Sequence, residues 1–221
     1  MKTKHDKYAI EYGLIIVMTL IVSAFTFVSY NLPANLMLSL FAVTLIALLY
    51  IWRKKLTRNN LYVNNILNLL FANIGAYIMI KYLAISIDSL IGFLAGVAVI
   101  DVLSFTRHGK RTLNAKLMSS TKSIARLSIC LPVAGKAGLQ PIIGVGDLLY
   151  YSVITMYFVQ ADGMEIGLRT ALFLLIGQIL NIIGIVVLKK RLKEQYKGFP
   201  ATIFPGILIL IAIAAHIIGV V

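Results

Sequence analysis

Apolar residues occur along this chain in long runs that are separated by short clusters of charged residues. A run of about 20 apolar residues is long enough for a helix to cross the hydrocarbon core of a bilayer. The pattern therefore predicts an all-α membrane protein, a polytopic bundle of about seven transmembrane helices. The predicted spans are residues 9–30, 35–52, 62–82, 86–105, 141–160, 167–188 and 199–219.

The composition agrees with this prediction. Of the 221 residues, 60% are hydrophobic, whereas a soluble domain is nearer 45–50%. The formal net charge of +13, from 21 Lys and Arg against eight Asp and Glu, would suggest nucleic-acid binding in a soluble protein. The cations lie instead in clusters between apolar runs, as is typical of topology determinants and lipid headgroup contacts. We therefore expect a lipid bilayer as the environment and no nucleic acid as a partner.

Cation-rich and cation-poor connections alternate along the chain. The cations gather in residues 2–7, 53–58, 107–136 and 189–197, while the connections between these clusters are nearly uncharged or carry acids. Because cation-rich segments stay in the cytoplasm, the alternation predicts a cytoplasmic N-terminus and an outside C-terminus in the cell membrane. The first apolar run is long enough to span and no small-residue cleavage site follows it, so we expect a retained helix rather than a signal peptide.

The domain organisation is simple. No internal repeat is visible, and residues 1–221 are expected to form a single membrane domain, with three spans in 1–85 and a four-span part in 86–221. One connection, 106–140, is long and is predicted to be cytoplasmic. Residues 127–134 within it are apolar but too short to span. A short strand, a re-entrant segment and an interfacial segment are all open for this stretch.

Two acids fall within predicted spans. A carboxylate inside a bilayer segment is costly unless it is paired or hydrated, so it marks a candidate functional site. Asp101 lies six residues before Arg107 and Asp147 lies six residues after Pro141. With the rise of a helix, both would lie roughly 9 Å from the same membrane face on consecutive antiparallel helices. We therefore predict that the two carboxylates meet.

A pair of carboxylates that shares one proton can hydrolyse a peptide bond. One, ionised, takes a proton from an attacking water, and the other, protonated, donates toward the developing oxyanion. Gly144 and Gly146 precede Asp147, and a chain without side chains there allows a substrate to approach the backbone closely. Helix packing through small residues is the alternative role for each glycine alone. The matched acid on the preceding span favours the catalytic interpretation.

Three short motifs resemble those of a known family. Ile100-Asp101, Gly144-Val145-Gly146-Asp147 and Pro200-Ala201-Thr202 are similar to the Tyr-Asp, Gly-x-Gly-Asp and Pro-Ala-Leu motifs of the presenilin and signal-peptide-peptidase family of intramembrane aspartyl proteases. The resemblance covers about the second half of the chain, and the predicted orientation is that of presenilin. Ile100 departs from the family Tyr and Thr202 from its Leu. The family has nine spans, against the seven counted in this chain.

The resemblance implies a function and a set of site residues. The chain would cleave peptide bonds within transmembrane segments of other membrane proteins, with no cofactor and no metal. A stretch in 127–134 or near Leu139 would add a strand to an extended substrate. By the resemblance, Asp101 and Asp147 are catalytic, and the substrate-binding residues are Gly144, Gly146, Pro200, Ala201 and Thr202.

Three other functions remain open. A prepilin-peptidase-like membrane aspartyl protease also has Gly-x-Gly-Asp, but its first aspartate usually begins a cytoplasmic stretch, whereas Asp101 is followed by Val-Leu-Ser-Phe. A proton- or cation-coupled transporter would use the same two aspartates, although no second broken helix is visible. In a membrane scaffold the aspartates would only pair with polar residues such as Asn68 or Asn73. Interhelical hydrogen bonds are the expected role of the polar residues within spans, namely Asn64, Asn65, Asn68, Asn73, Gln178 and Asn181.

Overall fold

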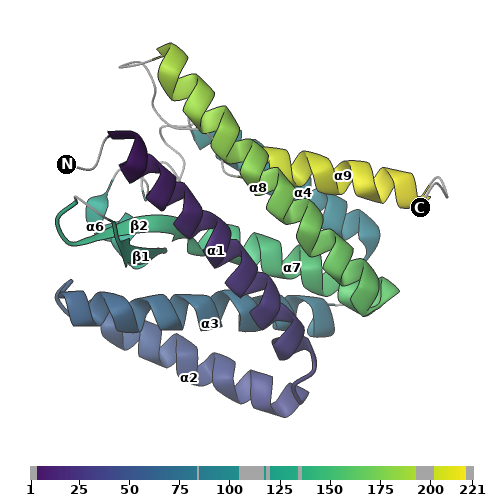
Figure 1. The fold of residues 1–221 in the computed structure, drawn as a ribbon. Helices are drawn as coiled ribbons and strands as arrows, with labels where there is room; N and C mark the ends of the chain where they lie inside the picture. Colours follow the sequence, from purple (N-terminus) through teal and green to yellow (C-terminus); the bar gives the residue numbers. More distant parts are fainter. Residues whose placement is uncertain are drawn as a thin grey trace.

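The computed structural model describes residues 4–83, 85–104, 117, 120–133, 136–192 and 202–217. Each of the seven predicted stretches corresponds to a long helix (Figure 1). Five of these helices, α1, α2, α3, α4 and α8, are long and apolar enough to cross a membrane, as expected of a membrane protein. The elements are α1 (Lys4–Tyr30), α2 (Ala34–Arg53), α3 (Arg58–Tyr82), α4 (Ile87–Ser104), α6 (Thr121–Arg126), β1 (Ser128–Pro132), β2 (Leu139–Gly144), α7 (Val145–Asp162), α8 (Met164–Leu192) and α9 (Ile203–Ile217).

Helices α7 and α9 do not belong to that group of five, for different reasons. Helix α9 is apolar but has only 15 residues. Helix α7 lies in the middle of the bundle, where α1, α3 and α8 pack around it (Figure 1). Eleven of its 18 residues are buried, including Tyr150, Tyr151, Ser152 and Thr155. Because protein rather than lipid covers α7, polar side chains on it can find partners inside the bundle.

The predicted start of the fifth span is wrong. Pro141 to Gly144 form the end of strand β2, and the helix begins only at Val145. Strand β2 pairs with β1 in an antiparallel sheet, in which Ser128 lies opposite Gly144 and Cys130 opposite Pro141. Proline has no backbone N–H to donate to a ladder, and Pro141 lies where the pairing is irregular, with a register shift between Ile129 and Cys130, as is usual for proline in a strand. Of the three possibilities for residues 127–134, the strand is therefore correct.

Asparagine side chains of α3 hold the β1–β2 hairpin. The Asn65 side chain accepts from the Cys130 N–H at 2.7 Å and donates to the Cys130 carbonyl at 2.6 Å. The Asn68 amide lies 2.8 Å from the Arg126 carbonyl and 3.2 Å from the Ser128 carbonyl. Buried backbone groups need hydrogen-bond partners, and these side chains supply them where a neighbouring strand would otherwise do so. Asn64 donates to the same Arg126 carbonyl at 2.9 Å and also accepts from the Trp52 indole of α2 at 3.0 Å, so its predicted interhelical bond is confirmed.

Asn73 and Gln178 also join helices. Thr26 of α1 lies 2.8 Å from the Asn73 side-chain oxygen of α3 and 3.3 Å from the Ser152 hydroxyl of α7. The Tyr151 hydroxyl of α7 donates to the Gln178 side chain of α8 at 2.6 Å. Interhelical hydrogen bonding is therefore confirmed for Asn73 and Gln178, and it connects α7 to the helices around it.

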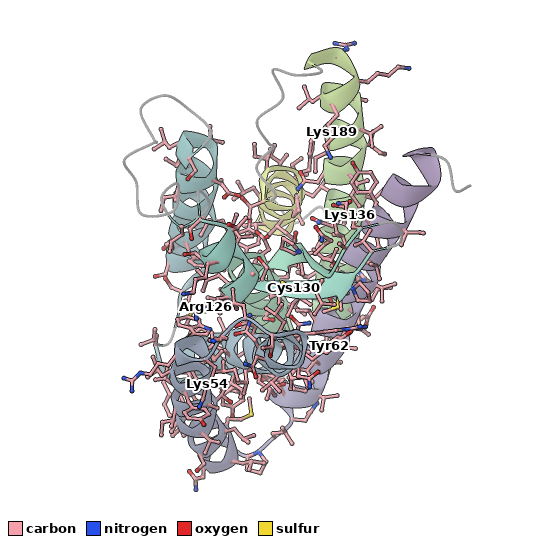
Figure 2. All side chains as sticks on the ribbon, turned by 90° about the vertical axis from the view of Figure 1, so that its left-hand side faces the viewer. Lys54, Tyr62, Arg126, Cys130, Lys136 and Lys189 are labelled. Atoms are coloured by element: carbon pink, nitrogen blue, oxygen red, sulfur yellow. The ribbon has the colours of Figure 1, made fainter. Side chains whose placement is uncertain are left out.

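Basic residues from distant parts of the chain gather at one end of the bundle. Figure 2 looks onto this end, where Lys54, Arg126, Lys136 and Lys189 lie around the hairpin. At this end of the bundle the start of α1, the end of α2, the hairpin and the end of α8 come together. The contacts that join them are Arg126 to the Lys54 carbonyl at 3.1 Å, Lys136 to Glu11 at 3.0 Å, and Lys189 to the Tyr12 hydroxyl at 3.4 Å.

Candidate active site

Asp147 lies in the first turn of α7, immediately after strand β2. One of its carboxylate oxygens accepts a hydrogen bond from the Gly144 N–H at 3.3 Å. A carboxylate in the first helical turn is stabilised by the free N–H groups and by the positive end of the helix dipole. The backbone at Gly144, at the end of the hairpin, therefore sets the position of Asp147.

The equal depths predicted for Asp101 and Asp147 rest on a helical rise from Pro141 to Asp147, which this segment does not have. Its first part is a strand, in which each residue advances about twice as far as in a helix. Support for the expectation that α4 and α7 lie near each other is geometric, because the rings of Phe93 on α4 and Tyr150 on α7 lie 6.1 Å apart between centroids. The side chains of Asp101 and Asp147 are both half-buried.

Asp101 has a partner from the last helix. The Thr202 hydroxyl donates a hydrogen bond of 2.7 Å to a carboxylate oxygen of Asp101. Thr202 immediately precedes α9 and is only 1% exposed. Residues from the first and third motifs, 101 positions apart in sequence, are thus in direct contact. We use the name dyad site for the two acids together with the start of α7 and the start of α9.

The two departures from the family motifs have different positions in this site. Ile100 is 53% exposed, so the side chain before Asp101 lies on the outer surface of the bundle and not between the acids. Thr202, in the position of the family leucine, supplies a hydroxyl to Asp101. Pro200 and Ala201, the other two predicted substrate-binding residues of this motif, lie outside the described residues.

The two motif glycines differ in their surroundings. A methyl group added at Gly144 would lie 3.2 Å from the Asp147 carboxylate oxygen, so glycine there leaves room for that carboxylate to fold back. Gly146 is exposed, and a methyl group added there would meet no described heavy atom within 4 Å. Helix packing does not explain Gly146, whereas an open backbone beside Asp147 is what close approach of a substrate requires.

Two buried tyrosines follow Asp147 and were not predicted as site residues. Tyr150 is three residues after Asp147 and therefore lies on the same face of α7. Its ring contacts Phe93 of α4 at 6.1 Å and Tyr151 at 5.9 Å between centroids. Its hydroxyl lies against Gly206 of α9. The spacing from Asp147 was the only signal in the sequence, because in-span aromatic residues usually serve packing.

The hairpin leads directly into the site. Strand β1 is covered at Cys130 by the Asn65 side chain, while β2 has no second strand beside it among the described residues. The end of β2 is Gly144, three residues before Asp147. Of the two stretches that the resemblance suggests for strand addition, β2 is the one that leads along the chain to the Asp147 carboxylate.

Other polar residues and the single cysteine do not join the dyad site. Asn68 and Asn73, the proposed partners of the aspartates in a scaffold, bind the hairpin and Thr26 instead. Cys130 is buried, its thiol donates to the Ala125 carbonyl at 3.4 Å, and burial raises the pKa of that thiol. Across the described residues, no three His, Cys, Asp or Glu side chains are grouped to hold a metal ion.

Comparison with known proteins adds no assignment to this geometry. No protein-family model matches the chain, and no curated protein and no solved structure matches it.

Proposed function

We propose that this chain is an intramembrane aspartyl protease that uses Asp101, Asp147 and a water molecule. The observation that carries the proposal is the hydrogen bond from Thr202 to Asp101. It brings Thr202, the last residue of the Pro-Ala-Thr motif, against the first acid, and the Tyr150 ring of α7 lies 6.1 Å from the Phe93 ring of α4, the helix that carries this acid. Thr202 of the third motif thus contacts Asp101 of the first, as the proposed site requires.

The chemistry needs only groups of this site. One carboxylate is ionised and takes a proton as the water oxygen attacks the peptide carbonyl carbon, while the other carboxyl donates its proton to the carbonyl oxygen. The tetrahedral intermediate then collapses: the carbon–nitrogen bond breaks, the leaving nitrogen takes the proton abstracted from water, and a hydroxyl of the intermediate returns a proton to the carboxylate that had donated one. The products are a new carboxyl terminus and a new amine, and the two acids return to their shared single proton.

The proposed topology has seven spans, including α7 and α9, with the N-terminus in the cytoplasm and the C-terminus outside. The gathering of cations at the hairpin end of the bundle supports this orientation. The dyad site would then lie toward the cytoplasmic face. The substrates would be transmembrane segments of other proteins, cut near their cytoplasmic ends.

A helical substrate has no exposed amide carbonyl to attack, so it must unwind locally before hydrolysis. An unwound segment that pairs with the edge of β2 opposite β1 would be directed toward Asp147, which favours strand addition as the binding mode. Substrates with Gly or Pro near the cut should therefore react faster than a uniformly Leu-rich helix of the same length. Equal rates for the two substrates would contradict the unwinding step.

The test uses the full chain purified in detergent and a model transmembrane substrate, with products mapped by mass spectrometry. Asp101→Asn and Asp147→Asn should each lower cleavage by at least about 10²-fold, the lower range for loss of an acid or base. Asp88→Asn is the matched control, because this exposed acid lies at the opposite end of the helix that carries Asp101. Cleavage that persists in either dyad variant would refute the mechanism.

The same variants separate the protease from the transporter. Reconstituted into vesicles, a transporter would carry protons or cations at a rate that falls in Asp101→Asn and Asp147→Asn. Flux of this kind, with no proteolysis by the unaltered chain, would replace the proposed function. Cleavage restricted to a charged leader segment outside the bilayer would favour the prepilin-peptidase alternative.

A further inference from the structure

The hydroxyl of Tyr150 is buried and has no hydrogen-bond partner among the described residues. Tyr150 is 1% exposed. A buried polar group without a partner costs free energy that a phenylalanine would not, so its presence calls for an explanation. The other tyrosine of the pair, Tyr151, follows the ordinary rule, because its hydroxyl donates to Gln178.

The Tyr150 hydroxyl lies where the three helices of the dyad site converge. Residues three apart share a helix face, and side chains lean toward the helix N-terminus, so Tyr150 extends back toward the turn that carries Asp147. Its ring is held by Phe93 of α4. Gly206 of α9, beside the hydroxyl, is one helical turn after Thr202, the partner of Asp101.

Gly206 makes room for this hydroxyl. A methyl group added to Gly206 would lie 2.8 Å from the Tyr150 oxygen, which is closer than a side-chain carbon ordinarily comes. Any residue larger than glycine at position 206 would therefore displace the hydroxyl from its place. The glycine on α9 and the unpartnered Tyr150 hydroxyl on α7 thus lie at the same point.

We propose that Tyr150 is a third catalytic residue, whose hydroxyl donates a hydrogen bond to the carbonyl oxygen of the scissile peptide. The inference rests on the proposed protease function. As water attacks, negative charge develops on that oxygen, and a fixed donor then binds the transition state more strongly than the substrate. Tyr150 keeps its proton throughout, so the proton exchange remains between water, the two acids and the leaving nitrogen.

The first test is Tyr150→Phe, measured as kcat and KM on a transmembrane substrate. We expect kcat to fall on the order of 10²-fold, as for loss of one oxyanion donor. The thermal midpoint should not fall, because the hydroxyl has no described partner to lose. The matched control is Tyr151→Phe, which removes the hydrogen bond to Gln178. This variant should lower the thermal midpoint, while its kcat, measured well below that midpoint, is largely retained.

The second test places the hydroxyl by a double-mutant cycle with Gly206→Ala. In the unaltered chain, Gly206→Ala should lower kcat because the new methyl displaces the hydroxyl. In the Tyr150→Phe background, it should lower kcat little further, because the atom that it would displace is absent. Additive losses would show that Gly206 acts on something other than the hydroxyl and would overturn the placement.

The outcomes distinguish this inference from the function on which it rests. If Asp101→Asn is inactive while Tyr150→Phe keeps the kcat of the unaltered chain, the catalytic role of Tyr150 is wrong and the protease stands. If Tyr150→Phe lowers the thermal midpoint, and the loss of kcat is explained by the smaller folded fraction at the assay temperature, the residue is structural and the inference is also wrong. An unaltered chain that folds but cleaves no substrate would overturn both.

Discussion

Helices α7 and α4 each carry one acid of the dyad site but are built into the molecule differently. Helix α7 lies among α1, α3 and α8, and 11 of its 18 residues are buried. Helix α4 lies at the periphery, where its main described contact is with α9 and only 11% of its span is buried within the protein (Figure 1). Asp147 is thus held in a packed centre and Asp101 on an outer helix.

The difference extends to the immediate partners of the acids. Asp147 bonds to the backbone of its own segment at Gly144, whereas Asp101 bonds to Thr202, which immediately precedes another helix, α9. A site with one fixed half and one peripheral half can admit a large substrate without opening the core, because motion is cheapest where few apolar contacts are lost. In the proposed protease, α4 and its contact with α9 would therefore govern how the two acids come together.

The largest expected effect concerns the two helices themselves. Leu148 of α7 and Leu94 of α4 are both essentially fully buried, at 0% and 1% exposure. Leu148→Ala should lower the free energy of unfolding by about 2–5 kcal/mol, because rigid surroundings keep the cavity open. Leu94→Ala should cost less, since a peripheral helix can collapse onto the space. Denaturant unfolding in detergent measures both, with exposed Ile100→Ala as control, and equal losses would contradict the comparison.

The next effect concerns the contact between α4 and α9. Thr202→Val keeps the side-chain shape but removes the donor to Asp101. A hydrogen bond to a charged group contributes about 1.5–3 kcal/mol, so kcat/KM should fall roughly 10- to 100-fold. Thr202→Ser keeps the hydroxyl and should restore most of the activity. If Ser and Val variants were equally impaired, the hydrogen bond would not be what matters.

A smaller effect is expected at the hairpin that precedes α7. Asn65→Ala removes two hydrogen bonds to Cys130, which should weaken hairpin docking by about 1–3 kcal/mol. Because burial raises the pKa of the Cys130 thiol, little reactive thiolate is present in the intact protein, and its amount grows as the pH rises.

Labelling of Cys130, the only cysteine, by a water-soluble maleimide therefore measures hairpin opening. The rate should rise roughly 5- to 100-fold in Asn65→Ala if reaction requires local opening. Asn60→Ala on the same helix is the control, because that side chain bonds to the Lys55 carbonyl and not to the hairpin. Equal labelling in both variants would show that Asn65 does not hold the strand.

The smallest effect on stability is expected at Gly146. Alanine there meets open space and favours a helix, so Gly146→Ala should stabilise the chain by about 1 kcal/mol at most. If a substrate backbone approaches this position, KM should nevertheless rise while kcat is retained. Gly144→Ala is the contrasting variant, because its methyl presses on the Asp147 carboxylate and should lower kcat instead. Unchanged KM in Gly146→Ala would exclude close approach at that residue.

The approximate positions of the seven long helices could be predicted from the sequence. In a bilayer, a spanning segment must satisfy its backbone internally, so a long apolar run is already a strong signal for a helix. The error at the start of α7 arose because apolarity alone does not separate a strand from a helix. The local signal was Pro141, which begins the last part of β2. The positions of Asp101 and Asp147 as the two candidate acids came from the same pattern.

The sequence by itself determined which residues are chemically capable: two acids in apolar surroundings and three short motifs. Only the tertiary structure decided which of them meet. It brought Thr202 to Asp101, left Ile100 on the outer surface, and set the Tyr150 hydroxyl against Gly206. The reason is physical: hydropathy and local bonding act within one segment, whereas contacts between α4, α7 and α9 depend on how whole helices pack.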